Sequence, residues 1–554
     1  MKRFLLAFFS VGLMVASATA QTDDHNLEVK KHLEVFNKAY TQLDLYYVDT
    51  LDAKKHLGNA LNYLMQSLDP YTEFYKEEQS HELREMSTGK YAGIGSPIYF
   101  DPQSKRCVFN SPYPDMPAGK AGLRTGDQIL NIDNVEMTPA ADESNQEFLS
   151  RVTDNLRGEA GSSFTLRVKR PWVTDSLLTF VLTRQIIERP SVEFVHLTPD
   201  SVGLIKLTSY IESTTREVKR AFVELKQRGM KQFVLDLRGN GGGLMQQAVD
   251  LVGLFMPTGT KVLETKGKLE WFNETSHTSD APLDVDIPIA VLVDGGTASA
   301  AEITSGAFQD YDRAVIVGMR TYGKGLVQTS LNLPYNSAIK LTTSKYLIPS
   351  GRLIQAYKYE NGEPVYQPDS LAKTFFTRNG RPVKDGGGIT PDVVVSEGGI
   401  GEFVFTLMDS RHVEDFTVRY RNTHESILPA KDFCLTDAEY DEFCSFIKER
   451  GFKPQLRTAK LFSMLKDAAH YNKLTDIENS PEWKALYALI VPDVESMLRT
   501  NSERIREIIE IYIVRNYYSD QGVEEYNLAR DKDLSKAIEV LKNEAEYKRI
   551  LSGK

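Results

Sequence analysis

Residues Ile289–Ile303, IAVLVDGGTASAAEI, decide how the middle of this chain folds. Five apolar residues, Ile289–Val293, predict a strand buried on both faces, and Gly295-Gly296 predict a tight turn directly after it. The small residues that follow predict a helix that begins near Ala298. A strand, a glycine-rich turn and a helix in this order indicate an α/β layered fold.

The same construction occurs twice more in the chain. The apolar run Phe233–Leu235 leads into DLRGNGGG at 236–243, and Ala314–Val317 leads into GMRTYGKG at 318–325. In α/β sheets, ligands and catalytic groups gather at the carboxyl ends of the strands. We therefore expect the three turns to converge on one crevice.

Ser299 is the candidate nucleophile of this crevice. It falls in the first turn of the predicted helix, where unpaired amides and the helix dipole favour developing negative charge. No histidine lies near it, since the flanking ones are His277 and His412. We expect Lys324, which lies between two glycines, to be the base. A lysine desolvated in a pocket has a lowered pKa and offers a neutral amine.

Further groups complete the candidate site. The Ala300 amide can face the oxyanion formed on attack, and the glycines at 241–243 let a second backbone amide approach a substrate carbonyl. Gln328 follows the lysine by four residues, so its side-chain oxygen could orient the lysine amine. Thr297 has the position of a helix cap, and Ser305, deeper in the helix, is expected to bond back to a carbonyl.

Taken singly, these elements have ordinary explanations. A serine at the start of a helix is usually a cap, and a lysine between glycines is usually a loop residue. The hypothesis therefore rests on three strand ends that supply a nucleophile, a base and an oxyanion donor together.

Residues 90–185 are punctuated by Gly and Pro and contain short apolar alternations. YAGIG at 91–95 and AGKAGLRTGDQILNI at 118–132 together resemble a PDZ domain, with Gly93-Ile94-Gly95 as the carboxylate-binding loop. Amides in such a loop bind a peptide's terminal carboxylate, while the adjoining strand edge pairs with the peptide. A tight start to a strand that needs two glycines is the alternative for the loop alone.

The two ends of the chain differ from its middle. Residues 1–20 have a basic start, a short apolar run and an Ala-Thr-Ala pattern, so we expect a signal peptide. An uncleaved N-terminal anchor is the alternative. Apolar residues at three-and-four spacing predict a helical region over 21–89, and residues 401–554 are predicted to form a helical C-terminal domain. The α/β core then spans 186–400.

Composition excludes several classes of protein. The formal charge of −10 over 554 residues argues against a nucleic-acid surface. Three cysteines are too few for a disulfide scaffold; Cys434 and Cys444 either pair or stay buried thiols. The nine histidines form no metal-binding pattern, so we expect neither a metal nor an organic cofactor.

Eight segments in order resemble the carboxyl-terminal processing proteases, which are serine peptidases with a Ser-Lys pair and an inserted PDZ domain. The segments are LDPYTEFY, YAGIG, AGLRTGDQILNI, LDLRGNGGG, VLVDGGTASAAEI, GMRTYGKGLVQ, TTSKYLIPSGRLIQ and GGGITPDVVV. The resemblance implies a crotonase/ClpP-like α/β core in which Ser299 is the nucleophile, Lys324 the base and Gln328 a supporting residue. It places the oxyanion hole at the amides of Gly242 and Ala300.

The resemblance also implies the substrates, the location and the partners of such an enzyme. Polypeptides that are cleaved near their C-termini are the expected substrates, with the PDZ domain engaging the tail. We expect export to the periplasm of a Gram-negative bacterium, with membrane association left open. An activating or adaptor protein and a homo-oligomer are partners of the kind such enzymes use.

Three other functions compete with this one. A relative with a decayed site would bind peptide or lipid without cleaving, but the retention of Ser299, Lys324 and Gln328 counts against it. A scaffold could use its PDZ domain to deliver a client to another protease. A penicillin-recognising enzyme is suggested by S-x-x-K at 445–448 and 463–466, yet no K-T-G or S-D-N run accompanies either segment.

Overall fold

The computed structural model describes the backbone of residues 2–77, 85, 87–141, 143–174, 176–395, 400–474 and 477–553, with side chains from residue 24 onward in these ranges. The chain divides into two compact units. Unit 1 comprises residues 1–80, 328–342 and 359–365, and unit 2 comprises the rest.

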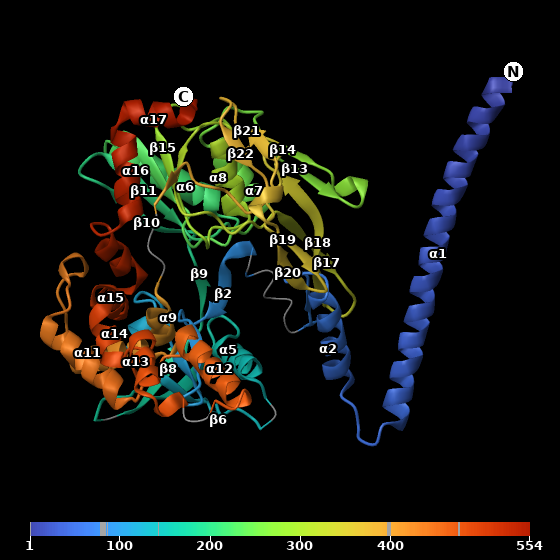
Figure 1. The fold of residues 1–554 in the computed structure, drawn as a ribbon. Helices are drawn as coiled ribbons and strands as arrows, with labels where there is room; N and C mark the ends of the chain where they lie inside the picture. Colours follow the sequence, from blue (N-terminus) through green and yellow to red (C-terminus); the bar gives the residue numbers. More distant parts are fainter. Residues whose placement is uncertain are drawn as a thin grey trace. The chain divides into compact units, whose positions relative to one another are not determined.

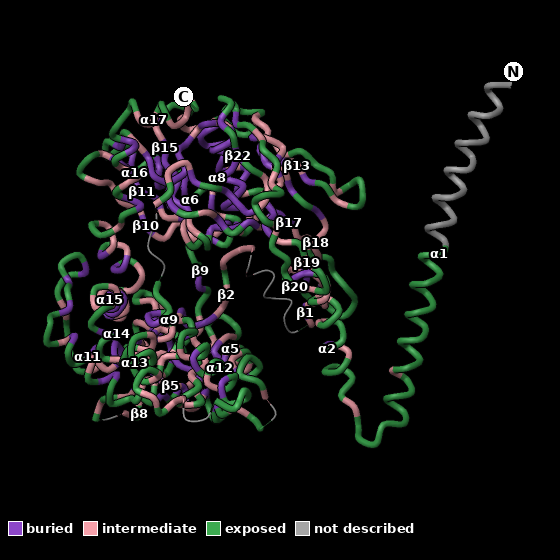
Figure 2. Tube along the Cα trace, in the orientation of Figure 1, coloured by how far each residue is buried: buried purple, intermediate pink, exposed green. Residues whose placement is uncertain are grey.

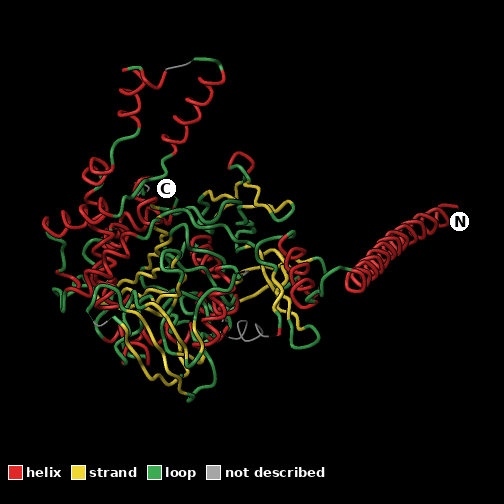
Figure 3. The backbone as a smooth tube through the Cα atoms, turned by 90° about the horizontal axis from the view of Figure 1, so that it is seen from below, coloured by secondary structure: helices red, strands yellow, loops and turns green. Residues whose placement is uncertain are grey.

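Unit 1 contains the N-terminal helices. Helix α1 (Lys2–Tyr46) is a single long helix (Figures 1 and 3), and α2 (Ala53–Gln66) follows it. The apolar stripe predicted here is solvent-exposed, with Leu33 59% and Phe36 49% accessible (Figure 2). Strand β1 (Glu73–Tyr75) pairs antiparallel with residues 338–340 of β18 (Ala338–Leu347).

The predicted signal peptide lies outside the residues whose side chains are described; the backbone from Lys2 belongs to α1. Among the described residues, no helix combines the length and the apolar character needed to cross a bilayer.

The core of unit 2 is a sheet of six strands among the residues described, in the order β10-β11-β12-β15-β16-β23. Strand β10 runs antiparallel to β11, and the remaining neighbours are parallel. The strands are β10 (Val192–Leu197), β11 (Val202–Leu207), β12 (Gln232–Asp236), β15 (Ile289–Val293), β16 (Val315–Gly318) and β23 (Val393–Val394).

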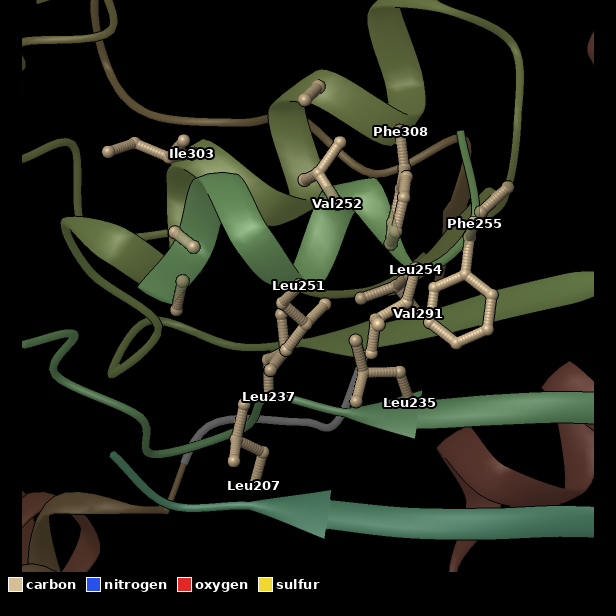
Figure 4. Packing of buried hydrophobic residues seen from close by; sticks show 14 of the residues in the cluster. Leu207, Leu235, Leu237, Leu251, Val252, Leu254, Phe255, Val291, Ile303 and Phe308 are labelled. Atoms are coloured by element: carbon tan, nitrogen blue, oxygen red, sulfur yellow. The ribbon is translucent and has the colours of Figure 1, made fainter. Parts of the chain in front are cut away.

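Both faces of this sheet are covered by helices. Successive strand residues point to opposite faces, so Val291 packs among helices on one side and Leu292 on the other. The first face carries α6 (Thr214–Gln227), α7 (Met245–Gly253) and α8 (Ala300–Asp310). Figure 4 shows apolar side chains of α7 and α8 beside those of the strands. The opposite face carries α16 (Lys532–Lys542). The predicted apolar, doubly buried strands are confirmed.

Further strands lie outside the six-stranded sheet. Residues 344–347 of β18 pair with β13, and β13 pairs with β14. The bounds are β13 (Lys261–Gly267), β14 (Thr275–His277), β17 (Leu326–Asn332), β19 (Tyr357–Glu360), β20 (Glu363–Tyr366), β21 (Thr374–Phe376) and β22 (Pro382–Lys384).

The PDZ-like region has its own sheet and its own core. Its strands are ordered β3-β4-β5-β7-β8, with β6 on β5, and two helices accompany them. Phe148 and Val152 of α5 are fully buried in this core. The bounds are β3 (Ile98–Asp101), β4 (Arg106–Phe109), α4 (Pro117–Lys120), β5 (Gln128–Ile132), β6 (Val135–Glu136), α5 (Asn145–Leu156), β7 (Ser163–Lys169) and β8 (Leu177–Thr183). Strands β2 (Lys90–Gly93) and β9 (Gln185–Glu188) pair at its two ends.

The C-terminal region is helical, as predicted, and has a separate apolar core. In α15, Ile505, Ile509 and Ile513 are buried along one stripe. The helices are α9 (Glu402–Asp409), α10 (His412–Thr423), α11 (Asp437–Glu449), α12 (Arg457–Tyr471), α13 (Pro481–Ile490), α14 (Val494–Thr500), α15 (Ser502–Asn527) and α17 (Glu544–Ser552). Helix α16 is not part of this core; its apolar side chains pack on the α/β sheet instead.

Removing apolar atoms where α16 meets the sheet should destabilise the α/β core. Leu541 is 1% exposed and packs on the strands, so Leu541→Ala should lower the free energy of unfolding by about 2–4 kcal/mol. Glu539→Ala, an exposed change on the same helix, should stay within about 0.5 kcal/mol of wild type. Urea unfolding measures both, and equal stability of the two variants would contradict the packing.

Candidate active site

The three glycine-rich turns leave the sheet at one edge, because β12, β15 and β16 are parallel neighbours. Backbone contacts join the turns to each other. The Ala298 amide donates to the Asn240 carbonyl at 2.9 Å, and the Tyr322 amide donates to the Thr297 carbonyl at 3.0 Å. The predicted convergence is confirmed.

Ser299 occupies the N-cap position of α8 in a strained conformation. Its φ of 55° and ψ of −116° are rarely adopted by a residue with a side chain. Such strain is of order 1–3 kcal/mol and persists only where the surrounding structure enforces it. Ser299 itself is half-buried.

A fully buried carboxylate, Glu302, enforces this conformation. Its Oε2 accepts the amide of Ser299 and the amide of Lys324, each at 2.9 Å. Its Oε1 accepts the amide of Gly323 at 2.8 Å and the hydroxyl of Thr321 at 2.5 Å. One side chain therefore fastens the turn that carries the serine to the turn that carries the lysine.

The ionisation of Glu302 is balanced by its surroundings. Burial is the largest influence and raises the pKa of Glu302 to about 7. The hydrogen bonds from Thr321, Lys324, Gly323 and Ser299 act in the opposite direction and lower the pKa. The ionised form suits the four donors, since a carboxylate only accepts hydrogen bonds.

A tyrosine holds the same two turns from a second side. The hydroxyl of Tyr346 donates to the carbonyl of Lys324 at 2.7 Å and lies 3.3 Å from the carbonyl of Ser299. Close packing fixes the lysine's neighbours, because a Cβ at Gly323 would lie 2.5 Å from the Cβ of Ala356. The segments of Ser299 and Lys324, far apart in sequence, are thus brought together.

The two predicted oxyanion donors lie against the serine. A Cβ on Gly242 would sit 2.8 Å from Ser299 Cβ and 2.9 Å from the amide nitrogen of Ala300, and φ at Gly242 is +96°. Only glycine fits there. The Gly242 amide already donates to Asn240 Oδ1 at 2.8 Å, so binding an oxyanion requires it to share or release that bond.

Gln328 lies in strand β17, not in a helical turn after the lysine. Its Nε2 donates to the Thr342 hydroxyl at 3.1 Å, and Thr342 Oγ1 lies 3.4 Å from Thr72 Oγ1. The boundary between the two compact units falls directly before Gln328. Its supporting role stays a prediction.

Two carboxylates at the site were missed by sequence reasoning. Glu302 is the third residue of the helix after Ser299, which is the S-x-x-E spacing of a capping box, and this signal was present. Asp294 Oδ1 accepts the amides of Gly239, Gly296 and Thr297, and it left no signal beyond its place in a turn.

The hydroxyls near Ser299 have structural partners. Thr297 is not the cap of α8; its buried hydroxyl donates to the Leu237 carbonyl at 2.9 Å and accepts the Asp294 amide. Ser305 Oγ donates to the Ala301 carbonyl at 2.9 Å, so the predicted back-bond is confirmed.

The predicted carboxylate-binding loop lines a groove of about 1050 Å³. Ile94 is buried, and a Cβ on Gly95 would lie 2.3 Å from Met116 Cβ, so the second glycine is required by packing. The groove continues along α5 to Thr208, Ser209 and Ile211 of the core, and its wall includes residues 519–521 of α15.

Other candidates form no site. Ser445 Oγ donates to the Asp441 carbonyl at 2.9 Å, and Lys466 forms an ion pair with Glu478. These residues of the S-x-x-K matches therefore have structural partners of their own. Cys434 and Cys444 are free thiols, so the pairing alternative is wrong. The buried-thiol alternative is also wrong for Cys434, which is exposed, while Cys444 is half-buried.

Comparisons with known protein families match two parts of the chain. Residues 201–364 match the family described as "Peptidase family S41", and residues 403–541 match "Probable PDZ-protease, C-terminal helical domain". The chain is 31% identical over 369 residues to a carboxy-terminal-processing protease of Bartonella bacilliformis, which covers 66% of this chain and 82% of that protein.

The chain belongs to the carboxyl-terminal processing proteases of peptidase family S41. It is therefore a serine peptidase with a PDZ domain and a helical C-terminal domain, and the predicted family, fold and enzyme class are confirmed.

Solved structures include similar proteins. The photosystem II D1 C-terminal processing protease is 28% identical with a TM-score of 0.37, covering 65% of this chain and 86% of that one. The PDZ domain of a carboxy-terminal protease from Vibrio cholerae, solved with a peptide, is 21% identical with a TM-score of 0.14, covering 18% and 99%.

A side chain at position 242 should abolish activity selectively. Gly242→Ala places a methyl group against Ser299 at a positive φ, so we expect a loss of about 100-fold or more in kcat. Gly241→Ala is the matched control, because a Cβ there meets nothing within 4 Å. Peptidase assays of both variants test this, and comparable activity of the two would refute the close approach.

Glu302 should give stability a distinctive pH dependence. Its folded pKa lies above the ordinary value of 4.5, so the folded protein keeps a proton that the unfolded chain releases as the pH rises toward 7. The free energy of unfolding should therefore fall through this window, by up to about 3 kcal/mol from this group. Urea unfolding at about pH 5 and about pH 7.5 measures the effect, with Glu302→Gln as the non-titrating control. Identical pH dependence in both proteins would contradict it.

Proposed function

We propose that this chain is an exported serine endopeptidase that cleaves polypeptides near their C-termini, with Ser299 as nucleophile and Lys324 as general base. The observation that carries the proposal is the shared acceptor: the amides of Ser299 and Lys324 donate to the same Glu302 oxygen at 2.9 Å each. The strained turn of Ser299 and the backbone of Lys324 are held by the same buried carboxylate, which supports their assignment as an activated nucleophile and its base.

The reaction follows from these positions. The neutral amine of Lys324 takes the proton of the Ser299 hydroxyl as the oxygen attacks the scissile carbonyl. The amides of Gly242 and Ala300 stabilise the oxyanion. Lys324 then donates its proton to the leaving nitrogen as the carbon–nitrogen bond breaks, and an acyl-enzyme remains. Water attacks the ester with Lys324 as base, and the serine oxygen recovers its proton.

The PDZ domain supplies the choice of substrate. Its groove binds the terminal carboxylate at Gly93-Ile94-Gly95 and pairs with the tail backbone, and its far end reaches Ser209 and Ile211 of the core, on either side of Tyr210. Tyr210 is bridged to Gly243 in the oxyanion turn, so the tail is led toward the site of cleavage. Gln328 has the supporting role beside Lys324. The exported protein acts in the periplasm.

The experiment compares the wild type and four variants of the full chain on an unstructured polypeptide with an apolar C-terminus. Ser299→Ala and Lys324→Ala should lose at least about 1000-fold in kcat/KM, because nucleophile and base act as a unit. Lys324→Arg should be equally inactive, since arginine stays protonated. Ser305→Ala, whose hydroxyl bonds within its own helix, should keep wild-type activity.

Two results would refute the assignment. Cleavage that persists in both Ser299→Ala and Lys324→Ala would remove the mechanism. Wild-type protein that binds the tail but neither cleaves it nor reacts with a fluorophosphonate at Ser299 would favour the decayed, peptide-binding relative.

A further inference from the structure

The arginine of the oxyanion turn is held by the C-terminal domain. Arg238 Nη1 and Nη2 donate to the two carboxylate oxygens of Asp531 at 3.0 and 2.5 Å, and Nη1 also donates to Asp533 at 3.2 Å. Its Nε and Nη2 bind Asp236 at 3.0 and 2.6 Å. Side chains nearly 300 residues apart therefore close around one guanidinium.

The two distant carboxylates are themselves fixed in position. Asp531 caps α16 by accepting the amide of Leu534 at 2.9 Å. Leu534 and Val540 of the same helix are buried on the central sheet. Because α16 is seated on the strands, its N-terminal carboxylates cannot drift away from the turn that follows β12.

Arg238 stands at the start of the turn that reaches Ser299. Its own amide donates to Asp236 Oδ1 at 3.0 Å, and the next amide, of Gly239, donates to Asp294 at 2.9 Å. The carbonyl of Asn240 then accepts the Ala298 amide, and Gly242 contacts Ser299. A shift of the guanidinium is therefore transmitted through four residues to the oxyanion donor.

Stability alone does not account for this cluster. Three carboxylates surround one guanidinium, all largely buried, and partly buried ion pairs contribute little net stability compared with apolar packing. The apolar contacts of α16 already attach it to the sheet. What the ion pairs add is a defined position for Arg238, since a bidentate pair fixes geometry.

We infer that Asp531 and Asp533 are positioning residues for catalysis: they hold Arg238, and through it the oxyanion turn, in register with Ser299. The C-terminal helical domain is then part of the catalytic unit rather than an appendage. This inference rests on the proposed function, because it concerns the alignment of that same site.

The test uses the full chain with Asp531→Asn and Asp533→Asn combined. Asparagine keeps the helix cap but removes both charges. We expect kcat to fall about 10- to 100-fold with KM changed less than about twofold, because the substrate groove is untouched. Lys542→Ala is the matched control, since it breaks an exposed pair with Asp200 at the other end of α16.

The outcomes separate the inference from the proposed function. Wild-type protein without Ser299-dependent cleavage would defeat the proposed function. An active wild type with a double variant as fast as Lys542→Ala would overturn the positioning role, as would a loss confined to KM. If the double variant fails to fold, Asp533→Asn alone decides, because the cap at Asp531 stays; unchanged kcat there overturns the inference.

Discussion

The catalytic centre depends on one buried carboxylate. Glu302 receives four hydrogen bonds from two segments, and two of the donors are the amides of Ser299 and Lys324. A group that accepts this many bonds away from water has no other low-energy arrangement, since any lost donor would be left unsatisfied. The distance between the serine and lysine segments is therefore set by the size of a single side chain.

The sheet explains why such a contact can exist at all. Parallel neighbours bring three turns to one edge, and helices on both faces keep the strands rigid. One of those helices, α16, comes from the far end of the chain. The C-terminal domain thus contributes both to the core of the peptidase and, through Arg238, to the turn that carries Gly242.

Local pattern predicted much of this arrangement. Apolar runs predicted the central strands, and the glycine-rich turns after them indicated Ser299, Lys324 and the glycines at 241–243; Gly242 itself was assigned through the family resemblance. The strands are apolar because both of their faces are buried, so that signal is strong. The back-bonded Ser305 was equally readable, because a hydroxyl within a helix has few partners.

Contacts between distant residues were beyond the same reasoning. The sequence around Arg238 does not predict its ion pair with Asp531. The sequence around Tyr346 does not predict the contacts of its hydroxyl with the carbonyls of Lys324 and Ser299. Glu302 could have been predicted, because Ser299 and Glu302 have the S-x-x-E spacing of a capping box. Gln328 was predicted from its spacing to Lys324 and from the family resemblance, and in strand β17 its amide donates to Thr342.

The most direct measurement is the rate at which a fluorophosphonate acylates Ser299 in Glu302→Gln. Glutamine would place an N–H donor opposite backbone amides that also donate, so at least one of the hydrogen bonds accepted by Glu302 must be lost. Labelling about 100-fold slower than in wild type, with peptide binding at the PDZ groove unchanged, is the predicted result. Labelling at the wild-type rate would contradict the account, because the serine and lysine turns would then stay aligned without the carboxylate.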